Sequence, residues 1–184
     1  MASEKHKENA VKDKRAVTVV LHNIRSVYNV GAILRTAEGL GIEKVVYSGY
    51  TPVYDDARLL PHLREKLNRQ IAKAALGAET MVAQETVEDL ADWLAAQRAA
   101  GKTVVGLENN LAADEQARKV MLSEVREQLG DVAETVLVLG EEVHGIPAEV
   151  REHCQYFLEI PMQGRKESFN VSVATAMALW ELTK

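Results

Sequence analysis

The chain has 184 residues, of which 47% are hydrophobic and 27% are charged, the composition of a globular domain with a sizeable core. No apolar run approaches the roughly 18 residues that cross a bilayer, and the charged N-terminus lacks the apolar core of a secretion signal. Both features disfavour a membrane or secreted protein, and we expect a cytoplasmic one.

Charge is unevenly distributed along the chain. The net charge of −5 argues weakly against a nucleic-acid partner, but residues 58–73 carry five basic side chains and one acidic side chain, whereas residues 108–134 carry seven acidic and three basic ones. A molecule polarised in this way can hold phosphates on one face. A solvated helix face is the simpler explanation of the basic stretch.

Short apolar strands alternate with helices after residues 1–15, a polar segment that we expect to be a flexible tail. In chain order, the pattern predicts a strand at 16–23, a helix at 30–40, a strand at 44–50, a helix at 65–76, a strand at 81–83, a helix at 87–100, a strand at 102–108, a helical insertion at 113–128, a strand at 135–140, a short helix after Pro147, a strand at 156–161 and a helix at 170–182. Apolar strands that alternate with helices predict a parallel sheet covered on both faces. We therefore expect residues 16–184 to form one α/β domain that binds its ligands at the carboxyl ends of the strands.

The first informative loop, residues 23–35, leads from the first strand into the first helix. Asn29 is expected to cap this helix, whose free N–H groups can hold an anion. Arg35 lies one to two turns further along. An asparagine cap and a helical arginine usually have structural roles, so this loop alone indicates little.

The second loop, residues 137–147, places Gly140 directly after a strand, where a ligand can approach the backbone closely. Glu142 can fix a loop or hold a cation. His144 is a candidate general base, although a turn histidine beside a glycine is usually structural.

The third loop begins at Ile160 and leads into the last helix. Ser168 and Asn170 precede that apolar helix, and either residue can simply cap it. Ser168 is not expected to be a nucleophile, because no strand–GxSxG–helix elbow surrounds it.

Several common signatures are missing from the chain. It has no GxxxxGK[ST] loop, no GxGxxG after the first strand and no HExxH pair, which disfavours a P-loop, a dinucleotide site and a zinc site. Cys154 is the only cysteine, so neither an internal disulfide nor a thiolate metal site can form. The three loops alone therefore indicate an α/β enzyme that binds a ligand at the strand ends, without a metal.

Taken together, the three loops resemble the three motifs of the SpoU/TrmH family, which are RNA ribose 2′-O-methyltransferases of the SPOUT superfamily. The resemblance covers about residues 17–183, with the motifs in the family's order and spacing. The matching segments are NVGAILRTAEGLG, with Asn29 and Arg35 at the functional positions; LVLGEEVHG, with Glu142 at the acidic position; and IPMQGRKESFNVSVATAMALWE, with Ser168 and Asn170.

The resemblance implies S-adenosylmethionine as the cofactor, structured RNA (tRNA or rRNA) as the substrate, a homodimer, and a C-terminal deep trefoil knot. In that knot, the chain after the second motif threads through a loop to form the cofactor pocket. The implied pocket uses backbone near Leu107, Gly140, Ile160, Met162 and Phe169, where Phe169 replaces the leucine common in the family. Many members have an RNA-binding domain ahead of the catalytic one. Only about 16 residues precede the catalytic domain in this chain, which favours a small folded target such as tRNA.

Arg35 is often regarded in this family as the group that activates the ribose hydroxyl. As a literal base it would have to lose a proton near neutral pH, which costs roughly 7.5 kcal/mol for about 5.5 pKa units. We therefore expect Arg35 to act as a fixed cation that holds the adjacent phosphate and stabilises the developing alkoxide. Asn29, Ser168 and Asn170 then orient the substrate, and Glu142 orders the loops, with Arg35 as a possible partner.

Two alternatives stay open at this point. A catalytically silent RNA-binding dimer would retain the fold, although it would have no chemical need for the complete motif set. Methylation of a base instead of a ribose is a minor alternative. Nucleoside analysis of RNA methylated by the protein separates all three.

Overall fold

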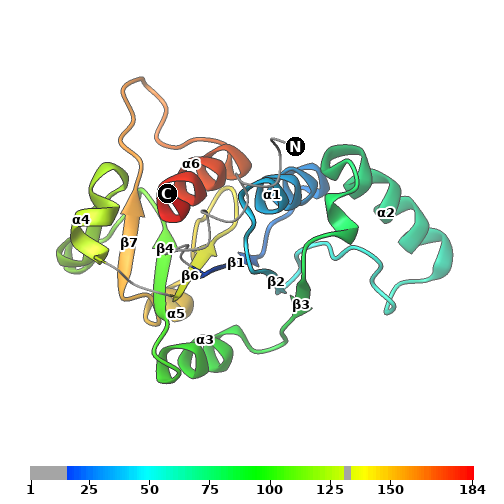
Figure 1. The fold of residues 1–184 in the computed structure, drawn as a ribbon, viewed down its shortest axis with the longest axis horizontal. Coiled ribbons are helices and arrows are strands. Elements are labelled where there is room, and N and C mark those ends of the chain that lie inside the picture. Colours follow the sequence, from blue (N-terminus) through cyan, green and yellow to red (C-terminus); the bar gives the residue numbers. More distant parts are fainter. Residues whose placement is uncertain (1–15, 131–133) are drawn as a thin grey trace, which may run out of the picture.

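The computed structural model describes residues 16–130 and 134–184 (Figure 1). The predicted tail at residues 1–15 lies outside the described residues. Among the residues that are described, no helix has the length and apolar character that a bilayer crossing requires.

The described strands form one seven-stranded sheet in which every neighbouring pair is parallel. Its order is β3-β2-β1-β6-β4-β7-β5, so β6 lies between β1 and β4. The predicted α/β fold with a parallel sheet is confirmed. The strands are β1 (Ala16–His22), β2 (Lys44–Ser48), β3 (Gln84–Thr86), β4 (Thr103–Leu107), β5 (Lys119–Met121), β6 (Glu134–Leu139) and β7 (Tyr156–Glu159).

Helices cover both faces of the sheet, as predicted, because each central strand buries apolar side chains in both directions. The larger core lies between one face and α1, α2, α4 and α6, and the smaller core lies between the opposite face and α3 and α5 (Figure 1). The α-helices are α1 (Val27–Leu40), α2 (Pro61–Ala75), α3 (Leu90–Ala99), α4 (Val125–Leu129), α5 (Ala148–Arg151) and α6 (Val171–Thr183), and the short 3₁₀ helices are η1 (Ala78–Thr80), η2 (Ala113–Arg118) and η3 (Leu122–Glu124).

Helix α1 packs between the sheet and other helices of the larger core. Its buried face includes Ile33 and Leu34, and Gly31 lies where α1 and α2 approach each other. A Cβ atom built at Gly31 would lie 2.5 Å from the carbonyl oxygen of Ile71 in α2. The glycine therefore permits the close approach of the two helices.

Two predicted elements were wrong in position or type. The strand expected at 81–83 lies instead at Gln84–Thr86, after the 3₁₀ helix η1. The insertion expected to be helical at 113–128 contains the edge strand β5, whose Val120 pairs with Leu158 of β7. Both strands are three residues long and lie at the sheet edges, where backbone pairing with a neighbour decides the structure.

The start of α1 also differs from the prediction. The helix begins at Val27, and Ser26 is the N-cap, with its hydroxyl accepting a hydrogen bond from the backbone N–H of Asn29 at 3.3 Å. Asn29 therefore lies inside the first turn and its side chain is free for other contacts, whereas the sequence predicted that Asn29 itself would be the cap.

Candidate functional site

A cavity lies at the carboxyl ends of β4, β6 and β7, where the connecting loops meet. Its walls come from the segment after β4, the loop after β6, Arg151 of α5, and the segment from β7 into α6. The lining residues are Leu107, Glu108, Asn109, Asn110, Leu139, Gly140, Glu141, Glu142, Val143, His144, Gly145, Arg151, Ile160, Ser168, Phe169, Asn170, Val171 and Ala174. This is the sheet edge at which the sequence predicted ligand binding.

The loop after β6 is a tight hairpin. Glu141 and Gly145 exchange two backbone hydrogen bonds, at 3.0 and 2.9 Å, and Gly145 has a φ of 72° that favours glycine. A Cβ atom at Gly140 would lie 2.2 Å from the carbonyl carbon of Gly145. Gly140 is thus required by the packing of the hairpin on itself.

Glu142, at the tip of this hairpin, holds the start of α1. Its carboxylate accepts hydrogen bonds from the backbone N–H groups of Arg25 and Ser26, at 3.1 and 3.2 Å, and from the side-chain amide of Asn29 at 3.0 Å. Burial on its own would raise the pKa of Glu142, but these bonds outweigh burial and leave its pKa below the usual value. Glu142 is therefore an ionised link between the first and second motif loops.

Asn29 continues this link to the third motif loop. Its side-chain oxygen accepts a hydrogen bond from the amide of Asn170 at 3.2 Å. Asn170 is also the N-cap of α6, since its own oxygen accepts from the backbone N–H of Ser172 at 2.9 Å. The contacts Glu142–Asn29–Asn170 thus bring the three loops together at one side of the cavity.

Asn109 holds the third loop from the opposite side. Its side-chain oxygen accepts from the backbone N–H of Ile160 at 3.1 Å, and its side-chain amide donates to the carbonyls of Ile160 and Glu167, at 2.9 and 3.2 Å. One side chain therefore fixes both ends of the polar segment that follows β7.

The sequence that forms this site matches a known family. The model of the SpoU rRNA Methylase family matches residues 16–180. This chain belongs to that family.

The SpoU family includes relatives and solved structures that resemble this chain over most of its length. The 23S rRNA (guanosine-2′-O-)-methyltransferase RlmB of Pseudomonas aeruginosa is 32% identical over 166 residues, covering 90% of this chain and 58% of the relative. RlmB of Xanthomonas axonopodis pv. citri is 31% identical over 170 residues, covering 92% and 59%. The chain therefore spans less than three fifths of the length of these two curated relatives.

Two solved structures are similar in fold as well as in sequence. An AdoMet-bound rRNA methyltransferase from Sinorhizobium meliloti has a TM-score of 0.72 and 25% identity, covering 92% of this chain and 56% of that one. A TrmH/SpoU tRNA modifying enzyme from A. aeolicus has a TM-score of 0.70 and 25% identity, covering 93% and 76%. The SpoU fold thus accounts for nearly all of this chain.

The structure places most of the residues expected to bind the SpoU cofactor at the cavity. Leu107, Gly140, Ile160 and Phe169 line it, whereas Met162, half-buried two residues beyond Ile160, does not.

The residues expected to be catalytic fall into two groups. Glu142, Ser168 and Asn170 line the cavity, and Asn29 touches two of them. Arg35 lies on the exposed surface of α1, outside the cavity lining. The expected pairing of Glu142 with Arg35 is wrong, because Arg25, Ser26 and Asn29 occupy the Glu142 carboxylate.

Sequence reasoning did not single out Glu108, Asn109 or Glu141, three polar side chains that line this cavity. Glu108 and Asn109 line it and bind the neighbouring loops, and their position after a buried strand was the available signal. Glu141 accepts a hydrogen bond from Nδ1 of His144 at 2.5 Å and forms an ion pair with Arg25 at 3.2 Å. The His144 contact is the main reason that the pKa of Glu141 is lowered.

Proposed function

We propose that this SpoU-family chain transfers a methyl group from S-adenosylmethionine to a ribose 2′-hydroxyl of structured RNA. The observation that carries the proposal is the contact series Glu142–Asn29–Asn170, which holds the three motif loops around one cavity. The names of the relatives support it, since two are rRNA (guanosine-2′-O-)-methyltransferases and one similar structure contains AdoMet.

The cavity suits this cofactor in its chemistry. Leu107, Ile160 and Phe169 supply apolar surface for an adenine ring. The hydrogen-bond donors to Glu142 are all uncharged, so its carboxylate keeps a negative charge at the cavity that suits a molecule carrying a sulfonium and an ammonium. When bound, S-adenosylmethionine supplies a methyl group attached to a sulfonium, whose leaving group is a neutral thioether. Met162, which does not line the cavity, stays a predicted cofactor contact.

The residues of the chain provide alignment for this reaction. Asn29, Glu142 and Asn170 fix the walls of the cavity, and Ser168 at its exposed rim orients the incoming ribose. Alignment alone contributes about 7–11 kcal/mol in well-oriented systems. Arg35 lies outside the cavity, so we assign it to an RNA phosphate next to the reacting ribose. There its cation also stabilises charge that develops on the 2′-oxygen as the hydroxyl proton passes to water.

We also propose the deep trefoil knot and a homodimer. The hydrogen bonds from the Asn109 side chain to the carbonyls of Ile160 and Glu167 hold the segment after β7 against the loop after β4, and this arrangement supports the knot. The exposure of Tyr28 on α1 and Trp180 on α6, at 50% and 56%, supports an interface through these two helices. Sedimentation at micromolar concentration should show a dimer, and a stable monomer would contradict it.

The test of the function uses labelled S-adenosylmethionine with tRNA and ribosomal RNA in separate reactions, followed by digestion to nucleosides. We expect label on 2′-O-methylated nucleosides from one of the two RNA classes. Label on a base, or no label from either RNA, would overturn the proposal. We also expect S-adenosylhomocysteine to bind equally with and without a chelator in calorimetry, and affinity that disappears on chelation would contradict this expectation. A cytoplasmic location stays a prediction.

A further inference from the structure

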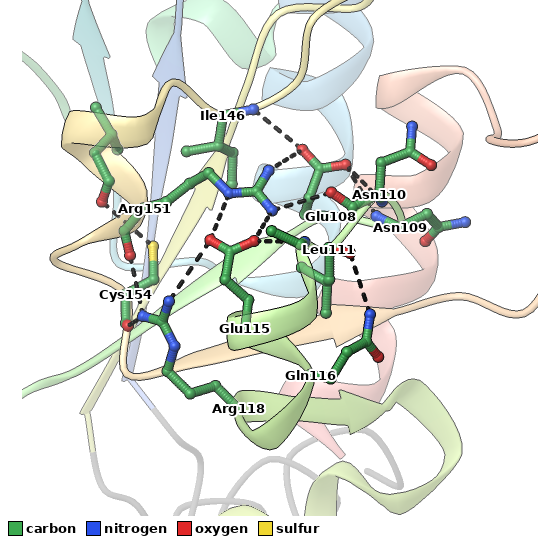
Figure 2. A network of polar contacts seen from close by, with 12 residues as sticks. Glu108, Asn109, Asn110, Leu111, Glu115, Gln116, Arg118, Ile146, Arg151 and Cys154 are labelled. Atoms are coloured by element: carbon green, nitrogen blue, oxygen red, sulfur yellow. Dashed lines mark hydrogen bonds and ion pairs between the residues drawn. The ribbon is translucent and has the colours of Figure 1, made fainter.

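The Glu108 carboxylate, directly after β4, joins two walls of the cavity (Figure 2). One oxygen accepts hydrogen bonds from the backbone N–H groups of Asn109 and Asn110, at 3.0 and 3.1 Å. The other accepts from the backbone N–H of Ile146, at 3.1 Å, at the end of the hairpin after β6. A Cβ atom at Gly145 would lie 2.1 Å from this second oxygen, so the hairpin glycine makes room for the carboxylate.

Arg151 of α5 neutralises this carboxylate. Its guanidinium lies 3.5 Å from Glu108, donates to the carbonyl of Asn110 at 3.0 Å, and forms a two-point ion pair with Glu115 of η2 (Figure 2). The side chains of Arg151, Glu108 and Glu115 are only 14%, 10% and 9% exposed, so they form a nearly buried ionic network. A buried charge of this kind needs its partner, because removing one member leaves the other unpaired.

A second arginine supports the network from below. Arg118 donates to the carbonyl of Cys154 at 2.8 Å, and its guanidinium carbon lies 4.9 Å from the ring centre of Phe157, with that of Arg151 at 5.2 Å from the same ring. The cationic pair is thus fixed by an aromatic ring of β7 as well as by carboxylates. The network connects η2 and α5, which sequence reasoning had left without a function, to the cavity.

We propose that Glu108 and Arg151 are positioning residues for the cofactor cavity, an inference that rests on the proposed function. Every oxygen of Glu108 already has protein donors, so Glu108 acts through the backbone that it holds. It fixes Ile146 of the hairpin and the turn at Asn109, and Asn109 in turn holds Ile160 and Glu167. The hairpin after β6 and the segment after β7 therefore depend on one carboxylate and its counter-ion.

Glu108→Gln tests this dependence with little change in volume. The amide has one oxygen for three backbone N–H donors and the guanidinium, so its –NH₂ group must face a donor on one side. We expect S-adenosylhomocysteine, measured by calorimetry, to bind Glu108→Gln and Arg151→Met at least 10-fold more weakly than wild type. Because both residues act on the same backbone segments, the double variant should lose little more affinity for S-adenosylhomocysteine than the weaker-binding single variant.

Hydrogen–deuterium exchange of the same proteins provides a second readout that does not depend on a ligand. We expect faster exchange in residues 140–146 and 160–167 of both variants, with β1 and α1 unchanged. Lys102→Met is the matched control, because it breaks an ion pair with Glu134 (2.9 Å) that lies outside the cavity. Its affinity and loop exchange should equal those of wild type.

The outcomes separate the two proposals. If wild type does not bind S-adenosylhomocysteine, the proposed function fails, and the exchange data alone decide the positioning role. If Glu108→Gln and Arg151→Met lower the melting temperature but leave affinity and loop exchange unchanged in the folded protein, the network is only structural and this inference is overturned.

Discussion

The amide of Asn170 donates a hydrogen bond to the side-chain oxygen of Asn29 at 3.2 Å, although 141 positions separate the two residues in the sequence. The amide of Asn29 in turn donates to Glu142 at 3.0 Å. Each polar end of the Asn29 side chain therefore faces a different motif loop, so its role is to hold these loops in register.

Replacing Asn29 should expose this role in a pH-dependent way. Asn29→Asp keeps an acceptor for Asn170 but places a second carboxylate against Glu142, so one of the two should take up a proton. We expect activity of Asn29→Asp to be low at pH 8 and to recover partly toward pH 6, as protonation restores a donor. Asn29→Ala has no group to titrate and should show no such recovery; a parallel pH–rate profile for the two variants would contradict the contact.

Arg35→Ala should lower the single-turnover methyl-transfer rate by about 10²–10³-fold, the usual effect of losing a positioned electrostatic group. Affinity for S-adenosylhomocysteine should stay unchanged, because Arg35 does not line the cavity. Arg35→Lys should recover little, since an ammonium does not reproduce the planar fork that grips a phosphate. Turnover within about twofold of wild type would remove Arg35 from the active site, and a parallel loss of affinity would place it in the cavity architecture.

Two glycines of α1 should respond to alanine with opposite signs. At Gly31 the new Cβ would meet the Ile71 carbonyl at 2.5 Å, so Gly31→Ala should lower the free energy of unfolding by about 1–3 kcal/mol. At Gly39 the Cβ meets no atom within 4 Å. Gly39→Ala should therefore raise the free energy of unfolding by about 0.4–1 kcal/mol, because alanine reduces the conformational entropy of the unfolded chain. Urea denaturation of both variants checks the pair, and equal effects would show that α1 and α2 do not pack closely.

Glu115 should contribute stability only above the acidic range. The side-chain contact with Arg151 is the main cause that lowers the pKa of Glu115 from 4.5 to about 2. Because the folded pKa is the lower one, the stabilisation is present above pH 4.5 and is lost as the pH falls from 4.5 through 2. Glu115→Gln should therefore be less stable than wild type by about 1–3 kcal/mol at pH 7. Denaturation at pH 7, 5, 4 and 3 should show the gap narrowing with acid, and a constant gap would rule out the ion pair.

The central elements could be predicted because the pattern of their apolar residues indicates which side chains are buried. β1 and β6 are runs of apolar, mostly β-branched side chains that are buried on both faces, and α1 has apolar residues at helical spacing. The edge strands β3 and β5 carry no such signal, since each has three residues and pairs mainly through its backbone. Their positions depend on neighbours that a local pattern does not contain.

The location of the cavity could be predicted from the sequence, but the side-chain contacts within it could not. The carboxyl ends of parallel strands must meet at one edge, which brings the three motif loops together. The partners of Glu142 depend on where α1 begins, because that start fixes the position and direction of the backbone N–H groups of Arg25 and Ser26. Similarly, the Glu108–Arg151 contact joins β4 to α5 through a tertiary approach that no spacing along the chain indicates.

The central position of β6 means that the sheet can be completed only late in synthesis. Ala16 of β1 pairs with Glu134 of β6, and Thr103 of β4 pairs with Thr135 of the same strand. During synthesis from the N-terminus, the inner edges of β1 and β4 therefore wait without their partner until β6 leaves the ribosome. Chains released before that point would expose one edge of β1 and both edges of β4, because β7 also follows β6 in the sequence. Unpaired edges of this kind join strands from other molecules. Premature termination within this chain should thus produce insoluble fragments and not a smaller folded domain.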